Sequence, residues 1–145
     1  MITEDYVSFE TAKLLKEKGF DEKCRYVYDK NGNMTSSECF MEGESFIDNN
    51  GIELTAKYDG WNIDTQGIYA FLCPTLQMAM KWLRETYNIH VVPKYDFYAG
   101  YYTGRIYDGR RETTSEREDY IPVVGNSTYE EACEEAIKYC LKNLI

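Results

Sequence analysis

The clearest alternation of apolar and polar positions lies in CPTLQMAMKWLRETYNIHVVP, residues 73–93. Five apolar residues recur there at helical spacing and form one face: Leu76, Ala79, Met80, Leu83 and Tyr87. Thr75 can cap the helix, or Cys73 can do so with Pro74 at the first helical position. The pattern becomes extended after Asn88. We predict a helix over 75–88 that runs directly into a strand.

Two further helices are predicted near the ends of the chain. Residues 127–144 carry a continuous apolar stripe that consists of Tyr129, Ala132, Cys133, Ala136, Ile137, Cys140 and Leu144. Its start offers two overlapping capping boxes, Ser127 with Glu130 and Thr128 with Glu131. Residues 7–20 read as a short helix, with Ser8 as N-cap and Gly19 in the left-handed position that ends it.

The remaining apolar runs predict strands. Residues 24–34 alternate and then meet Asn31-Gly32, which favours a hairpin with a type I′ turn and a return strand near 38–42. Between 43 and 67 there are turn signals at 50–51 and at 59–60, with a short strand, IELTAKY, between them. A β-hairpin and an irregular excursion fit that stretch equally well.

A three-stranded antiparallel meander is predicted from the segments 89–95, 95–108 and 119–124, with a charged loop at 109–118. Gly100 and Gly104 indicate a bulge or a strong twist, and Pro93 and Pro122 indicate edge strands or strand ends.

These elements predict an α+β fold in a single domain spanning residues 1–145, the size at which one core forms readily. We expect an antiparallel sheet of about four to six strands. The helices at 75–88 and 127–144 pack on one face, and a short N-terminal helix completes the domain.

Charge narrows the partners that the protein can have. The chain holds 16 Lys and Arg against 25 Asp and Glu, a net charge of −9 that repels nucleic acids and anionic membranes. In the most basic stretch, 105–119, the arginines are cancelled by neighbouring acids, so we interpret it as a solvated loop.

No run of apolar residues is long enough to span a membrane and no secretion signal opens the chain. The five cysteines are odd in number and show no CxxC spacing, so we expect a cytoplasmic protein with buried, reduced thiols.

Candidate chemistry is sparse. Cys73 precedes a helix, where a thiolate is favoured, but its only possible histidine base, His90, follows the far end of that helix about 20 Å away. Cys133 and Cys140 lie two helical turns or about 10 Å apart, too far to share a zinc ion. The sequence therefore predicts no catalytic residue, no metal and no cofactor, and it favours a protein that is not an enzyme.

Three residues are low-ranking surface candidates for binding a partner. Met78 and Trp82, four residues apart, form a second ridge beside the main apolar face of the 75–88 helix, and Trp61 follows the turn at 59–60. Packing in the core is the commoner role for such residues, and a partner-binding role requires a contiguous exposed apolar patch.

The run CPTLQMAMKWLRETYNIHVVP, the tyrosine-rich strands after it, the terminal TYEEACEEAIKYCL and the early VSFETAKLLKEKGF resemble one protein group. The group comprises small uncharacterised proteins of gut Bacteroidetes and their phages and mobile elements. The resemblance covers 73–107 and 127–145 best, and residues 40–70 depart from it most. It implies a phage or mobile-element context and carries over no functional residue.

The first expectation for function is a non-enzymatic accessory protein that acts through protein contact or self-association. A second is an acidic mimic of nucleic acid that inhibits a host DNA-binding protein, motivated by the charge of −9. A third is a small enzyme using Cys73.

Overall fold

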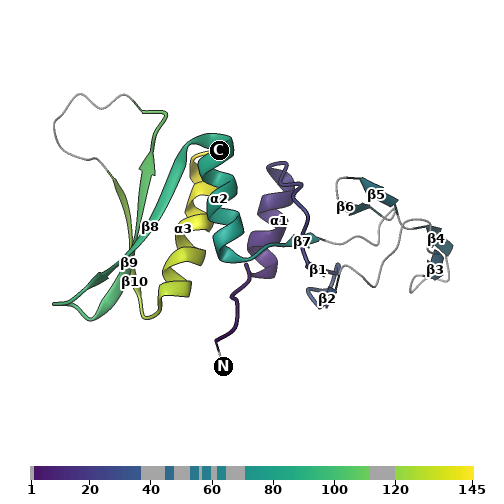
Figure 1. The fold of residues 1–145 in the computed structure, drawn as a ribbon, viewed down its shortest axis with the longest axis horizontal. Helices are drawn as coiled ribbons and strands as arrows, with labels where there is room; N and C mark the ends of the chain where they lie inside the picture. Colours follow the sequence, from purple (N-terminus) through teal and green to yellow (C-terminus); the bar gives the residue numbers. More distant parts are fainter. Residues whose placement is uncertain are drawn as a thin grey trace. The chain divides into compact units, whose positions relative to one another are not determined.

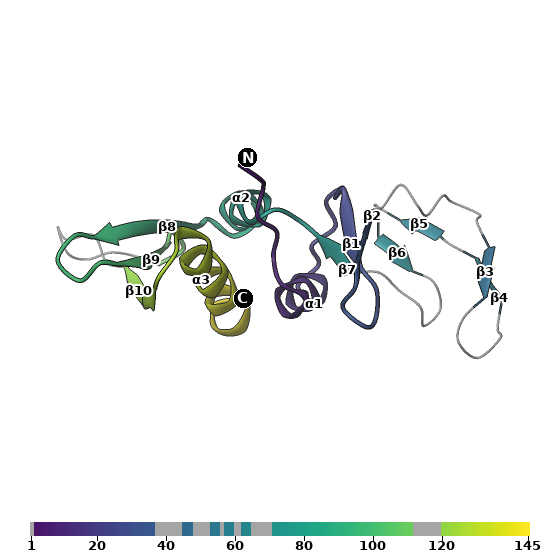
Figure 2. The ribbon, with the colours of Figure 1, turned by 90° about the horizontal axis from the view of Figure 1, so that it is seen from below.

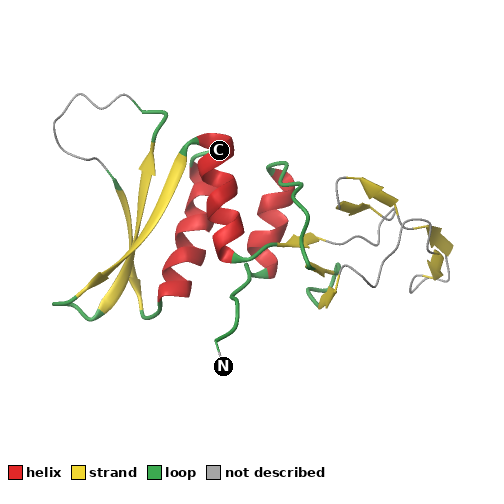
Figure 3. Ribbon diagram, viewed as in Figure 1, coloured by secondary structure: helices red, strands yellow, loops and turns green. Residues whose placement is uncertain are grey.

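The computed structural model describes residues 2–36, 45–47, 53–55, 57–59, 62–64, 71–111 and 120–145. They form two compact units, one of Ser8–Pro74 and one of Met1–Val7 with Thr75–Ile145. Helices pack against antiparallel strands, so the predicted α+β class is confirmed (Figure 1, Figure 3).

The described strands are divided among separate sheets rather than gathered in one. There are two three-stranded sheets, β2-β1-β7 and β10-β9-β8, and two two-stranded ladders, β3-β4 and β5-β6. One physical reason is visible at Pro74, which follows β7 and lacks the N–H that a longer strand would use. The chain enters a helix immediately after Pro74, and β7 pairs with β1, which precedes it in the chain.

In the Ser8–Pro74 unit, helix α1 (Phe9–Glu17) begins and ends as predicted. The Ser8 side chain accepts a hydrogen bond from the N–H of Thr11 at 3.2 Å. At the other end Gly19 has φ +86°, and the N–H of Phe20 donates to the carbonyl of Leu15 at 3.0 Å. These bonds satisfy backbone groups that the helix itself leaves unpaired.

Helix α1 packs on the sheet formed by β1 (Tyr26–Tyr28), β2 (Met34–Ser36) and β7 (Phe71–Cys73). The ring of Phe9 meets those of Tyr28 and Phe71 edge to face, with centroids 5.6 and 5.5 Å apart. Such pairs add to the stabilisation that burial alone gives.

The β1–β2 hairpin exists, but its turn differs from the predicted type I′. Among non-glycine residues that the structure describes, only Asn88 has a positive φ, so Asn31 does not take the left-handed conformation that type I′ requires. The Asp29 carboxylate accepts the N–H groups of Asn31 and Asn33 at 2.8 and 2.9 Å, and within this turn Gly32 alone is left-handed, at φ +84°. The described return strand is Met34–Ser36, while the stretch 38–42 lies outside the described residues.

In the 43–67 stretch the strands pair as hairpins. β3 (Ser45–Ile47) pairs antiparallel with β4 (Glu53–Thr55), and β5 (Lys57–Asp59) pairs with β6 (Asn62–Asp64). IELTAKY therefore contributes to two strands rather than one.

In the other unit, helix α2 (Leu76–Tyr87) starts at Thr75, not at Cys73. The Thr75 hydroxyl accepts the N–H of Met78 at 3.1 Å. Asn88 ends the helix in the left-handed conformation, with φ 54° and ψ 37°. The N–H of Leu76 donates to Asp5 at 3.0 Å, which ties the N-terminal stretch to this unit.

The predicted meander is confirmed as β8 (Ile89–Asp96), β9 (Tyr101–Asp108) and β10 (Ile121–Asn126), with β9 in the middle. Pro93 and Pro122 fall on the two edge strands, where a missing N–H costs least. The irregularity in the ladder lies between Val123 and Asn126, next to Gly125 at φ +91°.

Helix α3 (Tyr129–Asn143) crosses all three strands and lies on one side of their sheet in both views (Figure 1, Figure 2). Thr128 is its N-cap, and the carboxylate of Glu131 accepts the hydroxyl of Ser127 at 2.9 Å. Gly104 marks the crossing point rather than a bulge. A Cβ placed there would lie 2.9 Å from the Cβ of Ala136, so α3 can come this close only over a glycine.

The core of this unit follows the predicted helical faces and the inward side of the meander. Fully or nearly fully buried side chains are Leu76, Ala79, Met80, Leu83, Ile89, Val91, Ile106, Ala132, Cys133, Ala136, Ile137, Cys140 and Leu141. Helix α2 contacts both β8 and α3, so the two helices close one side of the sheet together.

Candidate functional site

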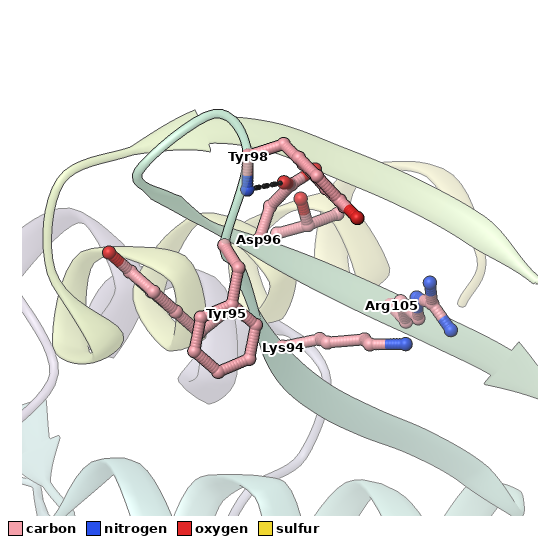
Figure 4. Close-up of a pocket in the computed structure, with 7 residues that line it drawn as sticks. Lys94, Tyr95, Asp96, Tyr98 and Arg105 are labelled. Atoms are coloured by element: carbon pink, nitrogen blue, oxygen red, sulfur yellow. Dashed lines mark hydrogen bonds between the residues drawn. The ribbon is translucent and has the colours of Figure 1, made fainter.

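The turn that joins β8 to β9, residues 97–100, is a firmly built feature of the surface. The Asp96 carboxylate accepts the N–H group of Tyr98 at 2.9 Å (Figure 4) and that of Ala99 at 3.0 Å. The N–H of Gly100 donates to the carbonyl of Asp96 at 2.8 Å, and Gly100 has φ +73°. Three hydrogen bonds, all accepted by Asp96, thus fix the backbone of this turn.

Two aromatic side chains project from this turn into solvent. Phe97 is 88% exposed and Tyr98 is 104% exposed. Exposed aromatic rings of this size are unusual for a surface that meets only water, and they mark interaction sites when they lie together. We call Phe97 and Tyr98, with the backbone that carries them, the aromatic turn.

Further aromatic rings continue from the aromatic turn along the side of the sheet that carries α3. Tyr95 contacts Phe97 edge to face at 5.2 Å and Tyr102 at 5.1 Å, and Tyr102 reaches Tyr129 at the start of α3 at 6.1 Å. The partial exposure of Tyr95, 41%, makes it part of the same surface. The ring of Tyr95 therefore supports the ring of Phe97 on one side.

The opposite side of the three-stranded sheet, which we call the outer face, carries different chemistry. Successive strand residues point to alternate sides, and buried Val91 and Ile106 turn toward α3 with Gly104. Val92, Lys94 and Arg105 therefore point away from that helix. Val92 is 45% exposed, so part of this face is apolar and accessible.

A hollow of about 290 Å³ lies where the outer face meets the aromatic turn. It is lined by Lys94, Tyr95, Asp96, Phe97, Tyr98, Thr103 and Arg105. Figure 4 shows Lys94 and Arg105 extending to one side of the strands and Tyr95 to the other. The hollow therefore combines two cations with apolar rings.

Arg105 is held in place by stacking. Its guanidinium lies 4.4 Å from the centre of the Tyr120 ring, a cation–π distance, and Tyr120 in turn packs on Tyr107 at 5.8 Å. The buried Nε of Arg105 has no hydrogen-bond partner among the described residues.

The other arginines of the 105–119 stretch that the structure describes are neutralised locally. Arg110 donates to both carboxylate oxygens of Asp108, at 2.9 and 3.0 Å, and to the carbonyl of Leu144 at 2.9 Å. Arg111 lies 3.7 Å from the same carboxylate. The hydrogen bond from Arg110 lowers the pKa of Asp108. These contacts fasten the end of α3 to β9, in keeping with a structural role for this part of the stretch; residues 112–119 lie outside the described residues.

Cys73 and His90 belong to different units and have separate surroundings. Cys73 is fully buried at the end of β7, opposite Tyr26. The Nε2 atom of His90 lies 2.8 Å from the Oδ1 atom of Asn88, which ends α2. Burial at the end of β7 thus gives Cys73 a structural role, and the contact with Asn88 gives one to His90.

The described cysteines Cys24, Cys73, Cys133 and Cys140 form no disulfide bond and are buried. Burial raises the pKa of Cys24 to about 12, with a further contribution from Cys73, and burial likewise raises the pKa of Cys140 to about 12 and of Cys133 to about 11. Thiols with such pKa values are poor nucleophiles near neutral pH. Within the described ranges, no three His, Cys, Asp or Glu side chains gather closely enough to hold a metal ion.

Of the three surface candidates from the sequence, the structure places two on α2. Trp82 is 9% exposed and meets Tyr87 edge to face at 5.3 Å, and Met78 is half-buried. Trp61 lies outside the described residues. A partner-binding role for these residues stays a prediction.

Sequence reasoning missed Phe97, Tyr98, Lys94 and Arg105. The signal was present in KYDFYAG, residues 94–100, where two aromatic residues stand between an aspartate and a glycine that both favour turns. Turns lie at the surface, so aromatic residues within a turn are candidates for exposure.

Comparisons of the chain with protein-family models, with curated proteins and with solved structures found no match. None of the helices in the described part of the chain has the length and apolar character needed to cross a membrane.

Proposed function

We propose that this protein is a non-enzymatic accessory protein of a phage or other mobile element, which acts by binding another protein through its aromatic turn. The observation that carries the proposal is the exposure of Phe97 and Tyr98, 88% and 104%, on a turn that its own hydrogen bonds hold rigid. Rigid aromatic anchors lose little conformational freedom on binding and dominate the energetics of protein interfaces.

The composition of the nearby surface supports this function. Tyr95, whose ring packs on Phe97, is 41% exposed and extends the apolar area of the turn. Tyrosine is well suited to such a surface because its ring packs while its hydroxyl stays in water. The mobile-element context rests on the resemblance of 73–107 and 127–145 to the uncharacterised Bacteroidetes group.

A cytoplasmic location is part of the proposal. It is supported by the odd number of cysteines and by the burial of the four that are described, which form no disulfide bond. Neither membranes nor nucleic acids are among the proposed partners, because the net charge of −9 opposes both.

The test is capture of a binding partner from an extract of a gut Bacteroidetes host by the immobilised protein. We expect the wild type to retain a defined protein and the Phe97→Ser/Tyr98→Ser variant to lose it. Ile2→Ser is the matched control, since Ile2 is 101% exposed but far along the chain from the turn. Equal capture by all three proteins would refute the proposal. Light scattering of the same variants separates binding of another protein from self-association.

A further inference from the structure

The hollow beside the aromatic turn concentrates positive charge in a strongly acidic protein. Lys94 stands opposite Thr103 and Arg105 opposite Val92, so the two cations occupy diagonal positions on the outer face. Side chains at such positions lie about 7–8 Å apart at their origins and interact directly when they are long. Like charges on neighbouring side chains repel one another, and an anion placed between them would relieve that repulsion.

The two cations share the hollow with one carboxylate, that of Asp96, and are not paired with it. Neither Lys94 nor Arg105 forms an ion pair with a residue in the described ranges. Asp96 also lines the hollow, but its Oδ1 atom accepts the N–H groups of Tyr98 and Ala99 and so serves the turn. The two cations therefore offer charge and hydrogen-bond donors to a ligand.

Arg105 is preorganised for binding an anion, because its guanidinium stacks on an aromatic ring. Its guanidinium is fixed at 4.4 Å over Tyr120, so little side-chain entropy is lost when it binds. Its Nε is buried without an acceptor in the described structure. A buried donor without a partner is unfavourable, and a ligand oxygen beside the guanidinium would supply an acceptor.

We propose that this hollow binds an acidic side chain of the partner protein, with the carboxylate between Lys94 and Arg105 and a neighbouring apolar side chain against Phe97 and Tyr98. This inference rests on the proposed function and adds the chemistry of the partner segment. The planar fork of an arginine matches a carboxylate, and a lysine beside it adds a point charge.

A peptide carboxylate fits the surroundings better than a nucleic acid. Arg110 and Arg111 are already paired with Asp108, so only two described cations of this region are available. Nucleic-acid binding draws on many phosphate contacts, which a protein of net charge −9 opposes over the whole length of the ligand. A peptide segment with one or two carboxylates in an otherwise apolar sequence escapes most of this repulsion, because its charges lie only beside Lys94 and Arg105.

The probe is a fluorescein-labelled ten-residue peptide in which a Phe stands between two Glu residues and Gly and Ser fill the other positions. We expect fluorescence anisotropy to show binding that weakens at least tenfold when Gln replaces both Glu residues. The variant Lys94→Gln/Arg105→Gln should weaken binding of the Glu peptide to the same degree, and Arg105→Lys should give an intermediate loss. Lys81→Gln/Arg84→Gln, which removes the same charge from exposed positions of α2, should leave binding unchanged.

Three results would overturn this inference. The Glu and Gln peptides could bind equally, a ten-nucleotide single-stranded DNA could bind more tightly than the Glu peptide, or Lys94→Gln/Arg105→Gln could dissociate a dimer of the protein itself. The partner captured from the extract separates this failure from that of the proposed function. If Lys94→Gln/Arg105→Gln retains the partner while Phe97→Ser/Tyr98→Ser loses it, the contact is apolar, the proposed function stands and the carboxylate site is refuted.

Discussion

Two turns of this protein are built alike and end in opposite surroundings. In the β1–β2 turn Asp29 accepts two backbone N–H groups and Gly32 takes a positive φ, and in the β8–β9 turn Asp96 and Gly100 do the same. The first turn lies against the ring of Phe9, so its glycine has an aromatic carbon 3.1 Å from the place of a Cβ. The second carries its own aromatic residues outward, and its glycine has nothing within 4 Å.

The difference separates a turn that contributes to the core from one that is available for binding. Hydrogen bonds from an aspartate and a glycine at positive φ fix either backbone, so apolar cover is not needed for rigidity. Cover of the first turn by α1 adds stability. Lack of cover at the second leaves Phe97 and Tyr98 accessible, which serves a partner rather than the fold.

The largest effect is expected from the aromatic ring that covers the first turn. Phe9→Ala removes the contacts with Tyr28 and Phe71 and should lower the free energy of unfolding of its unit by about 2–3 kcal/mol, less than a fully buried Phe because Phe9 is half-buried. Phe97→Ala should change it by no more than about 0.5 kcal/mol. Hydrogen–deuterium exchange of peptides from each unit during urea titration measures both. Similar losses in the two variants would mean that the second turn is structural after all.

The two glycines give the next largest contrast. Gly100→Ala should cost about 1 kcal/mol, since an L-residue at φ +73° is strained but meets no atom. Gly32→Ala should cost about 2 kcal/mol, because the same strain at φ +84° is joined by a Cβ only 3.1 Å from the Phe9 ring. Urea midpoints of the two variants decide the order. In the Phe9→Ala background the excess cost at Gly32 should disappear, and its persistence would rule out the Phe9 ring as the cause.

Much of this fold could be predicted from sequence because burial follows spacing. The face of α2, the cap at Thr75 and the edge positions of Pro93 and Pro122 all come from local rules that the structure obeys. The turn at Asn31-Gly32 could not, since the dipeptide allows several turns and the choice depends on the carboxylate of Asp29.

The candidate site was harder to predict than the fold. Gly104 reads as a bulge until α3 is seen to cross it at Ala136. Lys94 and Arg105 lie eleven residues apart in sequence, and only the register of β8 with β9 makes them neighbours. The sequence analysis weighed the exposure of Trp82 but not that of Phe97, and the two side chains are 9% and 88% exposed. Local periodicity identifies elements, but the pairing of distant residues decides which side chains meet.

The smallest effect concerns the charge of the aspartate in the covered turn, and it depends on pH. Burial alone would raise the pKa of Asp29, but hydrogen bonds from Asn33 and Asn31 outweigh it and lower the pKa below the ordinary value. A carboxyl group with a lowered folded-state pKa contributes stability that is present above about pH 4 and is lost as the pH falls through the folded-state pKa.

Asp29→Asn keeps an acceptor oxygen and removes the charge, so it should cost less than about 1 kcal/mol at pH 7 and nothing once Asp29 is protonated. Urea unfolding at pH 7 and at pH 2.5 tests this, with Glu85→Gln on the exposed side of α2 as the control for net charge. A deficit in Asp29→Asn that is as large at pH 2.5 as at pH 7 would show that the shape of the side chain, and not its charge, holds the turn. The turn at Asp96 would then also owe its rigidity to geometry, and its aromatic residues would keep their orientation in acid.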